Sequence, residues 1–499
     1  MEMQRVLYPY LRLQTSSLNI NDCFMKTSAK ARHLKGDVKR AWPRGDSISS
    51  RLAGLDADRA TGAFLFFLTS IIFLALPLPH LADSKYSTLL SQSLVQRRTF
   101  NLDAYKIPDL APTQTYNSAS NTTVYQIEHA GGHFYHMFPP GSAVLSAPYV
   151  ALLNLFRISA SNPDGSYNSH GEKVIQASLA SLLMGALTAI FFFTSRLLLP
   201  LDWSVWIALG GALGTQVWST ASRAMWSDTW GIFLLGYVIL LLLSDATGRR
   251  PFRPVWLATL LAWMYFVRPT YSIPITAITI YVLIYRRNLF VPFALTGAAW
   301  FAAFVAYSYF HFGQPLPFYY RASRLKFDSF SIAFAGNLIS PSRGLLTHVP
   351  ALFFVAYLLL RYARELPHAR LACVALGVIV LHLLVIAGFT PWWGGHSFGP
   401  RYTTGLVPWF VLLATLGVKA MLMWREKHAE AGGSLGWRAT LYAGAVLLVL
   451  SVLINGRGGI TPDTLRWNVY PQNIDEHPER VWDWRHPQVL AYGIGEEKH

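Results

Sequence analysis

Apolar runs of about 20 residues, the length that spans a bilayer, recur along the chain between short polar segments. Together with the basic residues that flank them, these runs predict about eleven membrane passes. Outside the stretch 255–285, the passes are predicted at 61–81, 172–198, 203–221, 226–244, 289–310, 350–361, 371–388, 407–423 and 439–455. The pattern therefore predicts an all-α polytopic membrane protein.

The apolar stretch 255–285 does not fit a single pass. As one helix it would be about 46 Å long at 1.5 Å per residue, against a hydrocarbon core of about 30 Å. Arg268-Pro269 interrupts the stretch, and basic residues lie at both of its ends. We predict a hairpin of two short helices that turns near Arg268. A single tilted and kinked span is the alternative, and it would reverse the topology of everything downstream.

The composition also indicates a membrane protein. Of the 499 residues, 53% are hydrophobic and 14% are charged, whereas soluble proteins carry roughly 25% charged residues. This excludes a soluble enzyme, a coiled coil and a disordered protein. Much of the net charge of +16 lies in the first 60 residues and in loops beside apolar runs. This placement indicates that the basic residues determine the membrane topology and contact anionic lipid headgroups. We therefore expect no nucleic-acid partner.

The basic residues also predict the orientation, because loops rich in lysine and arginine stay in the cytoplasm. They indicate a cytoplasmic basic head at 1–60, a transmembrane domain at 61–455 and an extracytoplasmic tail at 456–499. The first apolar run would then be a retained signal anchor, and 82–171 would be a long first outer loop. We expect a multi-pass protein with its N-terminus in the cytoplasm and its C-terminus outside.

All 26 acidic residues fall in loops or at the ends of predicted passes. Proton-coupled transporters usually place ionisable residues near the bilayer midplane, so this distribution weakens a transporter interpretation. Two acids stand out, because Asp83 directly follows the first pass and Asp228 lies in a tight outer turn. A carboxylate in the wall of a dry outer cleft can act as a general base on an alcohol or amine. The alternative for each acid is a helix cap or an interfacial residue.

The first outer loop contains two segments that predict helices lying at the membrane surface. One begins at Tyr86, shortly after Asp83, and has leucines at helical spacing. The other follows Pro139-Pro140-Gly141, where the prolines cannot continue a helix and the glycine permits a sharp turn. It runs over 142–156.

Three residues of the same loop, Glu128, His133 and His136, have side chains that can bind a metal ion. Structural or solvent-facing histidines are the more common case, so the interpretation without a metal is favoured. We expect no cofactor, and nothing in the pattern indicates a divalent metal ion.

Two later outer loops, 340–346 and 391–402, place an arginine among small residues. Small residues let the backbone approach a ligand closely, and an arginine can make a two-pronged contact with a phosphate. The candidates for binding a phosphate are Arg401, Arg343, Arg268 and Arg321, with His396 close to the first of them. The alternatives are an interfacial aromatic belt and arginines that anchor to lipid headgroups.

Taken in order, these features resemble a known family. An acid directly after the first pass, an amphipathic stretch, and Phe138-Pro139-Pro140-Gly141 before an apolar helix resemble the first outer loop of GT-C glycosyltransferases. The stretches around Arg343 and Arg401 are similar to motifs in many bacterial members. The resemblance covers roughly residues 60–490 and is strongest to the branch related to protein O-mannosyltransferases and the lipid A aminoarabinose transferase.

The resemblance implies a GT-C-like bundle in the bacterial inner membrane that uses a polyprenyl-phosphate-linked sugar. A hydroxyl or amine of a lipid, glycan or protein acceptor would attack the anomeric carbon with inversion, and the lipid phosphate would leave. Asp83 matches the general base and Asp228 a second acid that positions the acceptor or the base. The arginine that neutralises the phosphate would be Arg401, Arg343 or Arg268, in that order of preference. The chain has Asp83-Ser84 where the family commonly has an Asp-Glu pair, and many members need no metal.

Two other functions stay open. A lipid-linked saccharide transporter or flippase would use the same loops to hold headgroups without chemistry, and a membrane scaffold would have no catalytic site. An enzyme should bring Asp83 and Asp228 to one outer cavity, with an arginine within reach.

Overall fold

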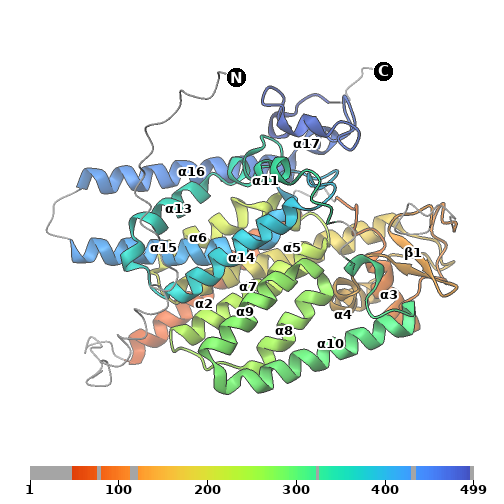
Figure 1. The fold of residues 1–499 in the computed structure, drawn as a ribbon, viewed down its shortest axis with the longest axis horizontal. Helices are drawn as coiled ribbons and strands as arrows, with labels where there is room; N and C mark the ends of the chain where they lie inside the picture. Colours follow the sequence, from red (N-terminus) through yellow and green to blue (C-terminus); the bar gives the residue numbers. More distant parts are fainter. Residues whose placement is uncertain (1–47, 76–79, 113–121, 322–324, 429–433, 495–499) are drawn as a thin grey trace, which may run out of the picture. The chain divides into compact units, whose positions relative to one another are not determined.

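A computed structural model describes residues 48–75, 80–112, 122–321, 325–428 and 434–494. Its contacts divide the chain into two units, Met1–Ala57 and Asp58–His499. Of the first unit, only the beginning of one helix is described. The second unit holds the helices and the candidate site, and all that follows concerns it (Figure 1).

The described chain is mostly helical. Within it, seven helices are long and apolar enough to cross a membrane: α2 (Ile48–Ala75), α5 (Ser169–Arg196), α7 (Ser227–Ala246), α10 (Phe290–Phe312), α14 (Ala369–Ala387), α15 (Val407–Lys427) and α16 (Ser434–Ile460). Shorter apolar helices are α4 (Gly141–Leu155), α6 (Leu201–Leu213), α8 (Pro254–Val267), α9 (Ser272–Tyr285), α11 (Phe330–Ile339) and α13 (Ala351–Arg361). The prediction of an all-α polytopic membrane protein is confirmed.

The hairpin predicted at 255–285 is also confirmed, since α8 and α9 are separate helices on either side of Arg268. Arg268 pairs with Asp228 in the first turn of α7, whereas Arg286, directly after α9, pairs with Asp245 in the last turn of α7. Helix α8 therefore runs from the Asp245 end of α7 to its Asp228 end, and α9 returns.

Some passes are shorter than predicted. The pass expected at 203–221 is helix α6 followed by a π-helical turn, η1 (Val217–Ala221), because Gly214 ends the regular helix. The pass expected at 350–361 is α13 alone, separated by Pro350 from the four-residue helix α12 (Leu345–His348). The first pass, expected at 61–81, is described as helix α2 as far as Ala75, and residues 76–79 lie outside the described part.

The two helices expected in the first outer loop are present. Helix α3 (Ser87–Arg97) packs against α4. Leu89, Leu90 and Val150 from these helices belong to a buried apolar cluster that is separate from the main core. Between them lies a hairpin that the apolar pattern did not predict, β1 (Ile127–Ala130) paired antiparallel with β2 (His133–His136). Its two-residue turn, Gly131-Gly132, has positive φ at both positions, as a tight hairpin turn requires.

The main core lies among α5, α6, α7, α8 and α15, and it fixes the elements that bear the candidate site. After α16 the tail forms α17 (Asp463–Arg466) and short turns. Trp467, Ile474 and Val481 of the tail pack with Trp392 from the loop after α14. The tail is therefore attached to the loop that carries Arg401.

Candidate functional site

Asp83 forms an ion pair with Arg401, although 318 residues separate them. Asp83 lies in the segment between α2 and α3, and Arg401 begins the 3-10 segment η7 (Arg401–Leu406) that leads into α15. The guanidinium carbon of Arg401 lies 3.9 Å from the centre of the Trp226 ring, which is a cation–π contact. The Asp83 side chain keeps 26% of its surface exposed and Arg401 11%. The pair is thus sheltered yet accessible to a ligand.

Asp228 forms a second ion pair, with Arg268 at the turn of the α8–α9 hairpin. Both side chains are almost fully buried. Asp228 lies in the first turn of α7, where the helix dipole stabilises a negative charge. The alternative of a simple helix cap does not describe Asp228, because Trp226 occupies the N-cap position and the carboxylate contacts Arg268.

The two ion pairs are neighbours. Trp226, on which Arg401 lies, precedes Asp228 by two residues. Arg268 and Arg401 are close enough for their charges to repel each other. The structure therefore brings both predicted acids to one end of the bundle, each with an arginine.

Glu172, in the first turn of α5, holds the segment that follows Asp83. It is fully buried and accepts hydrogen bonds from the backbone N–H of Tyr86 (3.0 Å) and the hydroxyls of Thr88 (2.7 Å) and Tyr167 (2.6 Å). Tyr86 has a φ of 70°, a left-handed conformation that a tyrosine rarely adopts. The hydrogen bond from the Tyr86 N–H to Glu172 stabilises this backbone conformation. Helix α3 can therefore begin at the next residue, shortly after Asp83.

Gln176, one turn further along α5, connects the segments that bear the two acids. Its amide nitrogen donates to the carbonyl of Ser84 at 2.7 Å, and its amide oxygen accepts from the N–H of Met225 at 3.0 Å. Ser84 adjoins Asp83, and Met225 lies three residues before Asp228. The pattern of apolar runs did not single out Glu172 or Gln176. Their spacing could have indicated them, because two polar residues four positions apart at the start of an apolar helix lie on the same helix face.

The Pro139-Pro140-Gly141 motif forms the start of α4, with Pro140 at the N-cap position. Gly141 is the first residue of the helix and its φ is not in the left-handed region, so its role here is not a turn that needs a glycine conformation. A Cβ on Gly141 would lie 2.5 Å from the backbone of Phe266 and 2.7 Å from that of Val267. The glycine lets α4 contact the end of α8, directly before Arg268.

His80 belongs to the site although the sequence did not mark it. Its ring lies edge-on to Trp226 at 5.3 Å. Burial, with the charge of the nearby Arg401, lowers the pKa of His80 to about 4, and the charge of Asp83 opposes the shift. Tyr125 lies near the same carboxylate: burial raises the pKa of the Tyr125 hydroxyl, and the charge of Asp83 adds to this.

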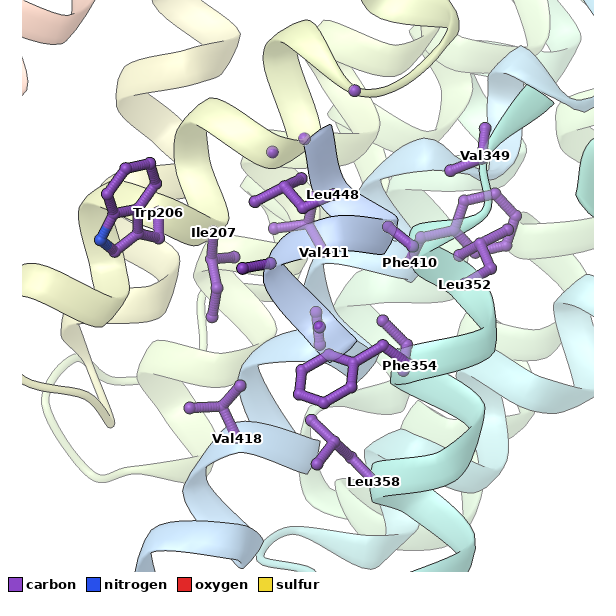
Figure 2. A pocket seen from close by; sticks show the side chains of 18 of the residues that line it. Trp206, Ile207, Val349, Leu352, Phe354, Leu358, Phe410, Val411, Val418 and Leu448 are labelled. Atoms are coloured by element: carbon purple, nitrogen blue, oxygen red, sulfur yellow. The ribbon is translucent and has the colours of Figure 1, made fainter. Parts of the chain in front are cut away.

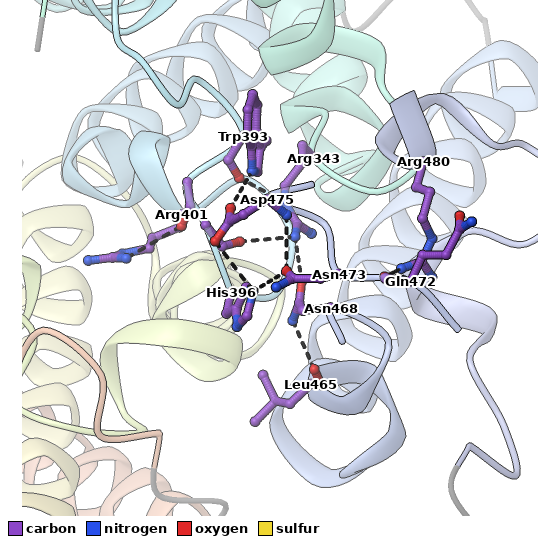
Figure 3. A network of polar contacts seen from close by, with 12 residues as sticks. Arg343, Trp393, His396, Arg401, Leu465, Asn468, Gln472, Asn473, Asp475 and Arg480 are labelled. Carbon is purple, nitrogen blue, oxygen red and sulfur yellow. Dashed lines mark hydrogen bonds and ion pairs between the residues drawn. The ribbon is translucent and has the colours of Figure 1, made fainter. Parts of the chain in front are cut away.

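Arg343 does not lie with the two acids. Its side chain is 1% exposed and donates to the carbonyl of Trp393 at 2.8 Å and to the side-chain oxygen of Asn468 at 2.6 Å, with a further bond to Gln488. Burial lowers its pKa to about 9. Figure 3 shows this network, with Arg401 pointing away from it. Arg343 thus attaches the tail to the loop that carries Arg401.

His396 lies between the tail and the Asp83 pair. Its Nε2 is 2.9 Å from the side-chain oxygen of Asn473 and 3.4 Å from that of Asp475 (Figure 3). The polar partners of His396 therefore come from the tail.

The residues considered for a metal ion have other contacts. His133 Nδ1 lies 2.5 Å from a carboxylate oxygen of Asp103, and His136 Nε2 lies 3.1 Å from the carbonyl of Lys85. Within the described ranges, no group of three His, Cys, Asp or Glu side chains is arranged to bind a metal ion. Arg321, the remaining candidate for a phosphate, is exposed and lies over the ring of Phe318.

An apolar cavity of about 380 Å³ lies among α6, α13, α15 and α16 (Figure 2). Its walls include Ile207, Phe354, Leu448 and Thr215. The residue after Thr215, Gln216, donates to the hydroxyl of Thr403 in η7 at 3.2 Å. The cavity is therefore lined by a residue whose neighbour contacts the segment that begins with Arg401.

No protein-family model matches the sequence, and no curated protein matches it. Among solved structures, the fold is similar to the Archaeoglobus fulgidus oligosaccharyltransferase, crystallised with an acceptor peptide containing the NVT sequon tethered through a disulfide bond. The two share 12% identity with a TM-score of 0.44, and the match covers 86% of this chain and 59% of the other. The chain thus spans about 59% of the length of that relative. Function therefore has to be inferred from the site itself.

Proposed function

We propose that the protein is an integral membrane glycosyltransferase that transfers a sugar from a polyprenyl-phosphate donor to a lipid, glycan or protein acceptor. The observation that carries the proposal is the pair of acid–arginine contacts, Asp83–Arg401 and Asp228–Arg268, gathered from distant segments at one end of the bundle. Such a site offers a base for the acceptor proton and fixed positive charge for the leaving phosphate.

The reaction we propose is a single displacement. The acceptor oxygen or nitrogen forms a bond to the anomeric carbon as the bond from that carbon to the phosphate oxygen breaks, so the configuration inverts. The phosphate leaves with the electron pair, and the acceptor proton passes to Asp83. Arg401 and Arg268 stabilise the charge that develops on the phosphate. Asp228 holds Arg268 in place.

The contact between Asp83 and Arg401 suggests an order of events. A carboxylate paired with an arginine is a weak base, because the positive charge lowers its pKa. A donor phosphate that binds Arg401 would compete with Asp83 and leave the carboxylate to accept a proton. Among the described residues the Nε–H of Arg401 is buried without a hydrogen-bond partner, so a shift of the side chain away from Asp83 would offer this donor to such a phosphate. Donor binding would thereby activate the base.

The apolar cavity supports a donor with a long hydrocarbon chain. Phe410 and Val411 of α15, the helix that follows η7, line this cavity, so we propose that the hydrocarbon chain of a donor held at Arg401 enters it. We place the site at the outer face of a bacterial inner membrane, with the N-terminus inside. Arg249, Arg250 and Arg253 support this orientation, because they lie at the opposite end of α7, where the positive-inside rule predicts cytoplasm.

The test uses the purified full chain in liposomes and lipid-linked sugars extracted from a strain that lacks the protein. We expect wild type to release free polyprenyl phosphate from this pool, with transfer of the sugar to a co-extracted acceptor. Asp83→Asn should still bind polyprenyl phosphate, as followed by tryptophan fluorescence, but should lose transfer. Arg401→Gln should lose both.

Two results would contradict the proposal. Full transfer by a folded Asp83→Asn variant would remove Asp83 from the mechanism. Movement of the lipid-linked sugar across the bilayer with no release of polyprenyl phosphate would favour the flippase alternative.

A further inference from the structure

A second cavity, of about 440 Å³, lies at the Asp245 end of α7, remote from the candidate site. The loop from α7 to α8 forms its rim with Arg250 and Arg253. Tyr237 and Leu241 from α7 form part of its wall, and Trp256 from the first turn of α8 forms another part. Both helices appear in yellow-green in Figure 1.

The polarity of this cavity changes along its length. The arginines are at the helix ends, whereas Tyr237 lies nine residues before the end of α7, which is about 14 Å deeper at 1.5 Å per residue. Leu241 and Leu257 make the intervening wall apolar. A free phosphate ion would use only the rim, whereas a molecule with an anionic head and a hydrocarbon chain matches both parts.

The positive charge at the rim is not neutralised by the nearby acid. Asp245 is bonded to Arg286, whose guanidinium nitrogens lie 3.0 and 2.6 Å from one carboxylate oxygen. Among the described residues, the ion pairs do not include Arg250 or Arg253. The backbone N–H of Arg250 is bonded to the carbonyl of Ser244 at 3.2 Å, which holds the loop against the end of α7.

We propose that this cavity binds one anionic phospholipid, with its phosphate on Arg250 and Arg253 and an acyl chain along Tyr237 and Leu241. Trp256 is half exposed and lies at the depth where aromatic side chains contact the headgroup region. A zwitterionic lipid has the same phosphate but carries an ammonium group that the two arginines repel. The site is therefore selective for net negative headgroups. This proposal does not depend on the proposed transferase activity.

The experiment is native mass spectrometry of the delipidated full chain in detergent, titrated with phosphatidylglycerol or with phosphatidylcholine. We expect the wild-type protein to retain one phosphatidylglycerol molecule in preference to phosphatidylcholine. Arg250→Gln/Arg253→Gln should weaken that binding about thirtyfold, from about 1 kcal/mol per basic side chain at a lipid surface. Each single variant should weaken it about fivefold, which keeps the test decisive if the double variant fails to fold.

Arg249→Gln/Arg287→Gln is the matched control, because it removes the same charge at the same end of the bundle from residues that do not line the cavity. It should bind phosphatidylglycerol like wild type. An equal loss in this control would overturn the proposal in favour of diffuse charge. Equal retention of phosphatidylcholine would overturn it as well. Displacement of the lipid by millimolar glycerol 3-phosphate would show that the rim alone binds, which also contradicts the proposal.

Discussion

Replacing Gln176 with methionine tests whether the two acids depend on one another through α5. Methionine has a similar length, so the change removes the hydrogen bonds without leaving a large cavity. The Ser84 carbonyl and the Met225 N–H would both lose their Gln176 partner inside the protein. Each unsatisfied buried backbone group costs about 1–3 kcal/mol, so Gln176→Met should lower the free energy of unfolding by about 2–6 kcal/mol.

The chain offers a matched control in Gln92, on α3. Gln92 is also buried; its amide oxygen accepts from the N–H of Ala160 at 3.0 Å, and its amide nitrogen donates to the hydroxyl of Ser161 at 2.6 Å. Gln92→Met should therefore destabilise the protein by a similar amount. Its contacts do not join the segments that bear Asp83 and Asp228, so it should leave the site geometry intact.

Both variants should be measured twice, by thermal unfolding in detergent and by sugar transfer well below the unfolding temperature. We expect similar losses of stability. Gln176→Met should lower the turnover rate at least about tenfold with little change in KM, since about 1.4 kcal/mol of lost positioning corresponds to that factor. Gln92→Met should keep the wild-type rate. If both variants transfer sugar equally well, Gln176 is structural only and the coupling of the two segments is refuted.

Three further results are expected. Removing one partner of the buried pair, as in Arg268→Gln, should cost about 3–5 kcal/mol in thermal or denaturant unfolding, because Asp228 is left charged and uncompensated, and Arg268→Gln/Asp228→Asn should recover part of the loss. Arg401→Lys keeps the charge but loses the planar contact with Trp226 and two-pronged binding, so polyprenyl phosphate should bind about tenfold more weakly in the fluorescence assay. His80 has its pKa lowered from 6.5 to about 4, so between these values the unfolded chain takes up a proton that the folded protein does not. The free energy of unfolding should therefore decrease as the pH is lowered through that window. In His80→Gln, with unfolding measured from pH 7 to pH 4, this decrease should be smaller.

The features that the sequence predicted well depend on length and local order. The hairpin at Arg268 followed from a stretch too long for one pass and too short for two, interrupted by Arg268-Pro269. Asp83 and Asp228 were singled out because each lies directly outside an apolar run, and their roles stay a prediction. These arguments need only the spacing of residues along the chain, so they did not require knowledge of the packing.

The pairing of arginines with acids could not be predicted in the same way. Arg343 and Arg401 both lie among small residues after an apolar run, and nothing local distinguishes them. The difference comes from the tail, because its Asn468 and Gln488 accept hydrogen bonds from Arg343. Arg343 therefore attaches the tail to the rest of the protein. The Glu172–Tyr86 contact was hidden for a related reason, because it joins residues 86 positions apart. The left-handed conformation of Tyr86 that goes with this contact cannot be predicted from the pattern of apolar residues.

The position of Arg401 between an acid and a proposed phosphate gives the two arginines different roles. During the proposed transfer, negative charge moves from Asp83, as it gains a proton, to the leaving phosphate. The net charge of the site stays constant, but its centre moves by the distance between the two groups. In the proposed order Arg401 contacts Asp83 until the donor phosphate binds, whereas Arg268 keeps its buried bond to Asp228 throughout. One arginine would thus first restrain the base and then stabilise the leaving group, while the other stays paired, which gives each acid a reason to have its own arginine.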